Sequence, residues 1–353
     1  MKLALITDTH WGVRNDNVAF MDNSKKFLAD IFFPYLVENK ITTVIHLGDI
    51  VDRRKYINFV TAGRLRTDFL EPLQAMGIKL HIIAGNHDVY YKNTNSVNAL
   101  YELIENKYDN VTIFTKTEGY THDGRDILYV PWINDENRKE TLEKINDTNA
   151  QIIMGHLELA GFQMYKGSMA SHGDDSSLFD RFDIVMSGHF HHRSTNGNIF
   201  YLGSHAEFTW SDWNDPKGFH IFDTKTQELE FIENPYTMFD KFWYDDVTAG
   251  SDPEAYDLNC WAGKFVKVIV KNKSDPYRFD KFMDKMHKVA LDVQIVEDHL
   301  NLNIEEDGDI VNEAESTQDI FNLYIDQINA PNLNKKRLQA TVVDLYNEAL
   351  AIE

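Results

Sequence analysis

The sequence has little of what marks secreted and membrane proteins. Among its 353 residues there is one cysteine, Cys260, so no disulfide can form within the chain, as is usual for proteins of a reducing cytoplasm. No run of 18 apolar residues occurs, so we expect no membrane-spanning helix. The first ten residues lack the small-residue cleavage site of a signal peptide, and we therefore read residues 1–10 as a first core strand.

Basic residues are also scarce relative to acidic ones. The chain has 35 Lys and Arg against 56 Asp and Glu, which gives a formal net charge of -21. An acidic chain does not attract DNA through its average field, so this balance argues against nucleic-acid binding unless cations or a partner supply positive charge. Part of the excess is local, because residues 295–320 hold nine acids and no Lys or Arg.

What is present is the composition of an ordered globular protein, with 43% hydrophobic and 12% aromatic residues. Short apolar runs first alternate with segments of helical spacing, and after residue 196 short strands follow one another. This order predicts an α/β fold, a two-sheet sandwich flanked by helices. The apolar runs are nearly continuous, so both faces of each sheet should be covered. We expect strands near residues 1–10, 42–47, 79–84, 127–130, 151–154 and 183–187, and helices near 20–38, 58–75 and 96–106.

The last third of the chain is organised differently. A strand over 265–270, a helix over 276–290 and a strand over 292–296 predict a small α+β capping domain. Two amphipathic helices end the chain, and their apolar stripes fit either a partner's groove or this chain's own core. The predicted parts are a sandwich domain at 1–240, the capping domain at 241–300, an acidic linker at 301–316 and a two-helix tail at 317–353.

Five short polar clusters each follow a predicted strand. In folds of this kind ligands gather at the carboxyl ends of strands, so we expect these side chains to meet. Their oxygen and nitrogen atoms suit Mn²⁺, Fe²⁺ or Zn²⁺, and the lack of a usable cysteine argues against a sulfur site. A glycine precedes four of them and lets the backbone turn sharply and approach an ion. The candidate metal ligands are Asp8, His10, Asp49, Asn86, His156, His189 and His191.

This set is large enough for two ions, and Asp49 can bridge them through its two carboxylate oxygens. Paired ions about 3.5–4 Å apart are suited to the hydrolysis of phosphate esters. His87 stands beside a ligand and is the candidate catalytic residue, placed to contact the phosphate or to protonate the leaving oxygen. The two sets of ligands are then Asp8, His10 and His191 for one ion, and Asn86, His156 and His189 for the other.

Each cluster also has an ordinary interpretation. Asp-x-His is common by chance, Gly-Asp is a frequent turn, and a single histidine is more often structural than a ligand. Five such clusters in order, each at the end of a predicted strand, favour a metal site over coincidence.

Basic and aromatic side chains near the clusters are candidate substrate contacts. Arg53, Arg54 and Lys55 follow Asp49 closely and can bind the phosphates of a DNA backbone. Tyr90 can stack on an unpaired base or fill the rim of the site. The alternative is that the three basic residues are scattered surface charges.

The clusters together resemble the signature of the calcineurin-like metallophosphoesterase superfamily, over about residues 1–235. The segment 48–53 is similar to one in Ser/Thr protein phosphatases, but those enzymes usually have Glu where Asp88 stands and Gly where Arg54 stands. The rest resembles SbcD-type DNA nuclease subunits, particularly those of T-even-type phages. The segments 201–204 and 215–219 and the order of the predicted parts carry this second resemblance.

The resemblance implies a DNA exonuclease and endonuclease that hydrolyses phosphodiester bonds with two divalent ions, usually Mn²⁺, with Mg²⁺ as the alternative. It implies the nuclease subunit of an SbcCD-like recombination and repair complex, whose SbcC-type coiled-coil ATPase binds the 317–353 tail. It also implies a homodimer formed by helices near the site, with 56–75 and 90–106 as candidates. The expected location is the cytoplasm, that of the host if the chain is phage-encoded.

Two other classes of function remain open at this point. One is a phosphodiesterase or protein phosphatase that acts on small or protein phosphoesters and has no need of the tail. The other is a scaffold that has kept the fold without catalysis, which the full set of seven competent ligand positions disfavours.

Overall fold

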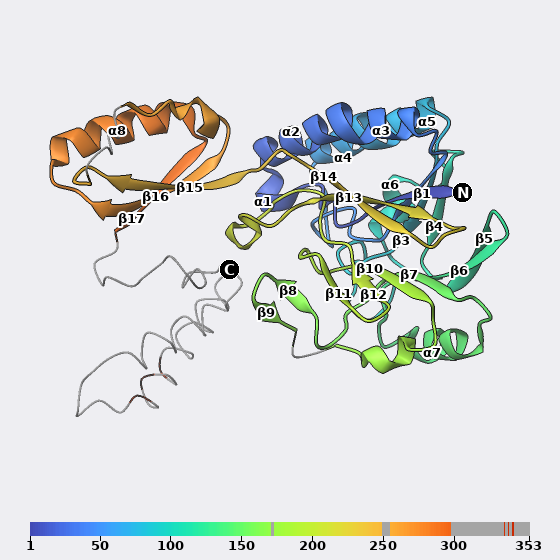
Figure 1. The fold of residues 1–353 in the computed structure, drawn as a ribbon. Coiled ribbons are helices and arrows are strands. Elements are labelled where there is room, and N and C mark those ends of the chain that lie inside the picture. The colour runs from blue at the N-terminus through green and yellow to red at the C-terminus, as the bar shows by residue number, and fades with distance from the viewer. Residues whose placement is uncertain (171–172, 249–254, 298–334, 336–337, 339–340, 342–353) are drawn as a thin grey trace. The chain divides into compact units, whose positions relative to one another are not determined.

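The computed structural model describes residues 1–170, 173–248 and 255–297, together with the single positions 335, 338 and 341 (Figure 1). The predicted acidic linker and all but three positions of the predicted tail lie outside the described residues. The chain divides into two compact units, one of residues 1–208 and 212–297 and the other of residues 209–211 and 298–353. All helices and strands named below belong to the first unit.

Two six-stranded mixed sheets form the body of this unit, which confirms the predicted two-sheet sandwich flanked by helices (Figure 1). Each sheet contains four neighbouring parallel strands; antiparallel strands complete one side of the first sheet and both edges of the second. The first sheet has the order β14 (Leu229–Glu233), β13 (Gly218–Asp223), β1 (Lys2–Ile6), β2 (Thr43–His46), β3 (Lys79–Ile83) and β4 (Val111–Phe114). The second has the order β11 (Ser194–Asn196), β12 (Ile199–Tyr201), β10 (Ile184–Gly188), β7 (Ile152–His156), β6 (Arg125–Val130) and β5 (Glu118–His122).

Two long helical segments cover the outer face of the first sheet. Each begins at an asparagine, Asn17 or Asn58, whose side chain accepts a hydrogen bond from the backbone two residues on. Each also passes through a π-helical turn, η1 or η2. The segments are α2 (Val18–Phe27), η1 (Leu28–Phe32) and α3 (Phe33–Glu38), then α4 (Phe59–Leu65), η2 (Arg66–Leu70) and α5 (Glu71–Ala75). These bounds agree with the helices predicted at 20–38 and 58–75.

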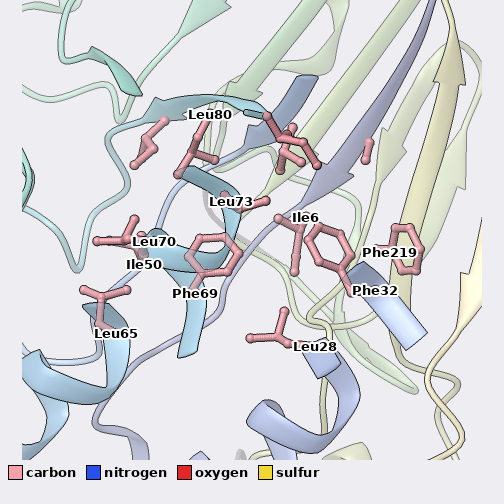
Figure 2. Packing of buried hydrophobic residues seen from close by; sticks show 14 of the residues in the cluster. Ile6, Leu28, Phe32, Ile50, Leu65, Phe69, Leu70, Leu73, Leu80 and Phe219 are labelled. Atoms are coloured by element: carbon pink, nitrogen blue, oxygen red, sulfur yellow. The ribbon is translucent and has the colours of Figure 1, made fainter. Parts of the chain in front are cut away.

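Alternate residues of the strands enter different cores. From β1, Ile6 packs with the helical residues Phe32 and Phe69, as Figure 2 shows. Its neighbour Leu5 points the other way, into the core between the two sheets, where it is clustered with Met154 of β7. A third core lies on the outer face of the second sheet and includes Ile145 of α7 (Arg138–Asp147). Both faces of the strands are therefore covered, which explains their continuous apolar runs.

One predicted helix is shorter than expected. Residues 96–106 were expected to be helical, but α6 runs only from Ala99 to Leu103. Asn98 begins this helix because its side chain accepts a hydrogen bond from the backbone of Tyr101, and Val89 forms an isolated bridge with Asn98. The candidate dimerisation segment 90–106 is therefore mostly loop.

The other short elements are α1 (Val13–Asp16), the hairpin of β8 (Gln163–Tyr165) and β9 (Ser168–Met169), and the 3₁₀ turns η3 (Ser176–Phe179) and η6 (Leu258–Trp261).

The capping region has one more strand than the sequence predicted. Its three-stranded sheet has the order β15 (Phe239–Asp245), β16 (Phe265–Asn272) and β17 (Asp292–Glu297), and all pairs are parallel. Asp275 caps the N-terminus of the helix α8 (Pro276–Val289). The helix buries Phe279, Phe282, Met283 and Met286 at helical spacing. Within the described residues, no helix has both the length and the apolar character needed to cross a membrane.

Candidate metal centre

The five polar clusters lie at the carboxyl ends of neighbouring parallel strands. In the first sheet, Asp8 and His10 follow β1, Asp49 follows β2 and Asn86 follows β3. In the second sheet, His156 ends β7, and the two histidines of the last cluster follow the adjacent strand β10. The seven predicted ligands therefore come from both sheets.

The first group of ligands contains Asp8, His10 and His191, whose donor atoms all lie within 4.8 Å of one another. The Nε2 atoms of His10 and His191 are 3.0 Å apart. His10 Nε2 is also 3.9 Å from Asp8 Oδ1. All three side chains are at least largely buried, and this is the grouping predicted for one ion.

The second group contains Asp49, His156 and His189, again within 4.8 Å of one another. The Oδ1 atom of Asn86 joins them, since it lies 2.9 Å from both His156 Nε2 and His189 Nδ1. Asp49 Oδ2 is 3.3 Å from His156 Nε2 and 3.9 Å from His10 Nε2. The Asp49 carboxylate thus stands between the two groups, where a bridging ligand is needed.

The orientation of His156 shows that a cation fits here. Its Nδ1 lies 2.7 Å from the carbonyl oxygen of Leu47, so Nδ1 carries a proton and donates it. In the neutral ring Nε2 is then an acceptor, yet it faces oxygens of Asp49 and Asn86, which also accept. Either a second proton on Nε2 or a metal ion can supply the positive charge that these acceptors require, and the nitrogen and oxygen donors suit a divalent transition metal.

The electrostatics of the group agree with this interpretation. Burial lowers the pKa of His156, but the charges of Asp49 and Asp8 outweigh it and raise the pKa to about 9. Burial also lowers the pKa of His10, and the hydrogen bond and charge of Asp52 together with Asp49 raise it to about 9. The pKa of His189, by contrast, is lowered to about 3, mainly by burial. The carboxylates therefore favour positive charge at their centre.

Four of the ligand positions have a backbone conformation that residues other than glycine rarely adopt. The φ angles are 51° at Asp8, 42° at His10, 55° at Asp49 and 88° at His189. Such conformations cost about 1–3 kcal/mol each and persist only where the surroundings impose them. Backbone hydrogen bonds across the sheet hold two of them, from the Asp8 N–H to the Gly48 carbonyl and from the His10 N–H to the Asp49 carbonyl. Strain of this kind gathers at functional sites.

The glycines before the ligands serve mainly for close approach. A Cβ atom at Gly85 would overlap the Asp49 carboxylate, although the φ angle of Gly85 does not itself require glycine. At Gly48 both reasons apply, because φ is 101° and a Cβ would overlap the His156 ring. Glycine is therefore required at Gly48 by the sharp turn that was expected before each ligand. At Gly85 glycine is required because there is no space for a Cβ atom.

The comparison with known families agrees with this geometry. The model for calcineurin-like phosphoesterases matches residues 1–193, which is more than half of the chain. The chain belongs to this family. Exonuclease subunit 1 of Enterobacteria phage T4 is 34% identical over 99% of both chains. A subunit of the SbcCD nuclease from Staphylococcus epidermidis is 26% identical over 65% of this chain and 67% of its own. The DNA double-strand break repair protein Mre11 of Methanocaldococcus jannaschii is 23% identical over 82% of this chain and 74% of its own.

In this calcineurin-like phosphoesterase, the candidate catalytic residue His87 lies outside the two predicted ligand groups, but its ring forms a third group with His10 and Asp52, whose donor atoms also lie within 4.8 Å of one another. Its backbone N–H donates to Asp49 Oδ1 at 2.7 Å, and its Nδ1 contacts the carbonyl oxygen of Asp52. The ring packs edge-on against that of His10, with centroids 4.9 Å apart. With Nδ1 engaged, Nε2 is the ring atom left to contact a phosphate.

Asp88 has a structural role that the sequence analysis did not assign. Its carboxylate accepts hydrogen bonds from the backbone N–H groups of Asp49, Ile50, Val51 and Gly85. Asp88 is fully buried, and burial with the nearby charge of Asp49 raises its pKa to about 7. This one side chain fixes both loops that follow β2 and β3. Its place in the Gly-Asn-His-Asp cluster was the only available signal.

His46 also forms hydrogen bonds that hold the loops after β1 and β2, which carry predicted ligands. Its Nε2 lies 2.9 Å from Thr9 Oγ1, and its Nδ1 accepts from the Gly48 N–H at 3.3 Å. Burial lowers the pKa of His46 to about 3, so the ring is neutral. By itself the sequence indicates only a structural histidine here, and nothing local points to the two loops it joins.

The four candidate DNA contacts line one pocket of about 150 Å³ on the continuation of the loops after β2 and β3. Arg53 is engaged within the chain, since it forms an ion pair with Asp16 at 2.7 Å. The Nη1 atom of Arg54 is buried and has no hydrogen-bond partner among the residues that the structure describes. Lys55 and Tyr90 also border this pocket, and they are exposed.

Proposed function

We propose that this protein is a two-metal DNA nuclease that hydrolyses phosphodiester bonds, both as exonuclease and endonuclease. It is the nuclease subunit of an SbcCD-like recombination and repair complex. The observation that carries the proposal is the convergence of seven oxygen and nitrogen donors in two groups, with the Asp49 carboxylate between them. Two of the relatives that match the chain are named as nucleases, one of them over 99% of its length, and a third is named as a DNA double-strand break repair protein; these names support DNA as the substrate.

Two divalent ions complete the site. Asp8, His10 and His191 would hold one ion and Asn86, His156 and His189 the other, with the Asp49 carboxylate between the two groups. Mn²⁺ is the proposed native ion, because the resemblance to SbcD-type nuclease subunits implies it, and Mg²⁺ is the alternative. When bound, the ions supply positive charge for the phosphate oxygens and lower the pKa of a water near phosphorus.

The chain's own residues then act on the phosphate. His87 turns Nε2 toward the substrate because its Nδ1 is engaged by the Asp52 carbonyl oxygen. In its protonated form it donates Nε2–H to a phosphate oxygen or to the leaving oxygen. The backbone N–H of His87 donates a hydrogen bond to Asp49 Oδ1, and this contact ties the position of the catalytic residue to that of the proposed ligand.

Substrate contacts are proposed for the pocket after the ligand loops. Arg54 and Lys55 bind phosphates of the DNA backbone, and the buried Nη1 of Arg54, which lacks a partner within the described part of the chain, supports this role. Tyr90 stacks on an unpaired base. Arg53 contributes through its ion pair with Asp16, which orders the loop beside the pocket. These local charges act in a chain whose net charge is -21, so binding depends on the site and not on the average field.

Two protein partners are proposed. The tail at 317–353 binds an SbcC-type coiled-coil ATPase, in keeping with the apolar stripes of its sequence and the SbcCD name of one relative. A homodimer forms through the region of α4, where Tyr56 is 64%, Phe59 93% and Val60 59% exposed. The complex works in the cytoplasm, that of the host if the chain is phage-encoded.

The test uses purified full-length chain, linear double-stranded DNA and Mn²⁺. Wild type should degrade the DNA, and Asp49→Ala should lose this activity together with at least one bound ion. Asp147→Ala, at an exposed position of α7, is the matched control and should behave as wild type. Hydrolysis of a small phosphodiester or a phosphopeptide without cleavage of DNA would instead support the phosphodiesterase or phosphatase alternative.

A further inference from the structure

A buried lysine joins the two sheets behind the candidate metal centre. Lys217 immediately precedes β13, which pairs with β1 in the first sheet. Its Nζ donates to the backbone carbonyl oxygen of His191 at 2.7 Å, and His191 follows β10 of the second sheet. A charged side chain next to a strand of the first sheet therefore donates a hydrogen bond to the backbone of a predicted ligand that follows a strand of the second sheet.

Two carboxylates complete the environment of this lysine. Lys217 Nζ lies 2.8 Å from Asp212 Oδ1 and 2.8 Å from Asp215 Oδ2. Lys217 is only 4% exposed, and both aspartates are buried as well. Buried ion pairs are retained at a high desolvation cost and require full hydrogen bonding, which three oxygen acceptors provide for the three protons of the ammonium group.

The remaining oxygens of the two aspartates extend the network. Asp215 Oδ1 is 3.0 Å from His192 Nδ1, beside the ligand His191. Asp212 Oδ2 accepts from the backbone N–H of Phe208 at 2.8 Å. The Phe208 ring packs edge-on against the rings of both His10 and His191, with centroids 5.7 and 5.8 Å away. The buried charges thus bear on both histidines of the first ligand group.

We propose that Lys217, with Asp212 and Asp215, is a positioning element that holds His191 beside His10 and so sets the affinity for one of the two ions. The inference rests on the proposed two-metal function. His10 and His191 belong to different sheets, so their spacing depends on a connection between the sheets at this edge. The second group is held by another contact, the donation from His156 Nδ1 to Leu47. Loss of the lysine network should therefore affect one ion and spare the other.

The variant must remove the network without leaving charges buried and unpaired. Lys217→Met alone would leave two buried carboxylates without their cation. The neutral triple variant, with Lys217→Met, Asp212→Asn and Asp215→Asn, avoids this and keeps the shapes of the side chains. The matched control is Lys144→Met, because Lys144 also donates to a backbone carbonyl, that of Thr117, but on α7.

The measurement is Mn²⁺ binding to the metal-free full-length chain, by calorimetry and by electron paramagnetic resonance, with thermal unfolding as a check of folding. Wild type and the control should bind two ions and show the spectrum of a coupled Mn²⁺ pair. The triple variant should bind one ion about 10–100-fold more weakly, leave the other unchanged, and show an isolated ion at low Mn²⁺. Unchanged binding of both ions, or equal weakening of both, would overturn the inference.

Two further variants separate positioning from a general structural effect. Asp215→Asn alone keeps the ion pair of Lys217 with Asp212, and it should weaken binding of the same ion by a smaller factor. This single variant tests the inference if the triple variant unfolds. In a His191→Ala background, the triple substitution should cause no further loss of Mn²⁺ affinity, and an additive loss would contradict the inference. If wild type itself binds fewer than two ions, the proposed two-metal function fails, and the inference fails with it.

Discussion

The Nε2 atoms of His10 and His191 lie 3.0 Å apart, although the two residues are separated by 181 positions and follow strands of different sheets. Two imidazole nitrogens at this distance share either a proton or a metal ion. Because Asp8 and Asp49 lie 3.9 Å from the same nitrogen of His10, positive charge is favoured at this point. The relation between the two sheets is thus part of the site itself.

His87→Ala should leave the metal centre intact and remove most of the cleavage. The side chain belongs to neither predicted ligand group, although it lies in a third cluster with His10 and Asp52, and its loss removes a proton donor, an effect of about 10²–10⁴-fold on turnover. Cleavage of DNA and Mn²⁺ stoichiometry should be measured on the same preparation. A loss of bound Mn²⁺ would show that His87 is a ligand and would contradict the catalytic role.

Mn²⁺ affinity should rise with pH up to about 9. The pKa values of His10 and His156 are both raised to about 9, so each ring must lose a proton before it can bind an ion at lower pH. Proton release at pH 7 is measured by calorimetry in buffers of different ionisation enthalpy. Binding without proton release would mean that neither histidine coordinates the ion.

The same two groups predict how the stability of the metal-free chain depends on pH. A histidine whose pKa is about 6.5 in the unfolded chain and about 9 in the folded chain makes its full contribution to the stability of the fold below about pH 6.5. This contribution is lost as pH rises through 9, so the unfolding temperature without metal should fall between pH 7 and 9. Added Mn²⁺ should reverse the fall, since it replaces the protons as the positive charge. A flat profile without metal would refute the raised pKa values.

Gly85→Ala should damage the site because the new Cβ would overlap the Asp49 carboxylate and backbone. We expect a loss of about 1–3 kcal/mol in the free energy of unfolding, the usual cost of overpacking, together with weaker Mn²⁺ binding. Gly119→Ala is the control, since a Cβ there meets no atom within 4 Å. Equal behaviour of the two variants in denaturant unfolding and Mn²⁺ titration would show that the close approach at Gly85 is unimportant.

Truncation after about residue 300 should abolish binding of the ATPase partner and leave Mn²⁺ binding unchanged. All seven predicted ligands lie before residue 192, whereas the proposed partner-binding tail covers 317–353. Co-purification with an SbcC-type ATPase, compared between full-length and truncated chain, measures the first effect. Retained co-purification would place the partner's binding site elsewhere on the chain.

Much of the fold was predictable because it depends on local patterns. The strands β1, β2, β3, β7 and β10 are buried on both faces and appear as apolar runs. The strand β5 is almost wholly exposed, so it has no apolar run and was not predicted. The strand β15 was missed because its residues are neither continuously apolar nor regularly alternating, in keeping with its irregular burial.

By itself, the sequence determined the types of the candidate ligands, their order and their places at strand ends, since motifs and strand boundaries are local properties. The sequence also predicted how the ligands divide into two groups, but only the tertiary structure decided the distances within each group and which residues hold the ligands in place. Asp88, His46 and Lys217 bind loops that are distant in sequence, and nothing in their own neighbourhoods indicates those partners. Such contacts exist only after two sheets have packed, because burial then forces each buried polar group to find a hydrogen-bond partner.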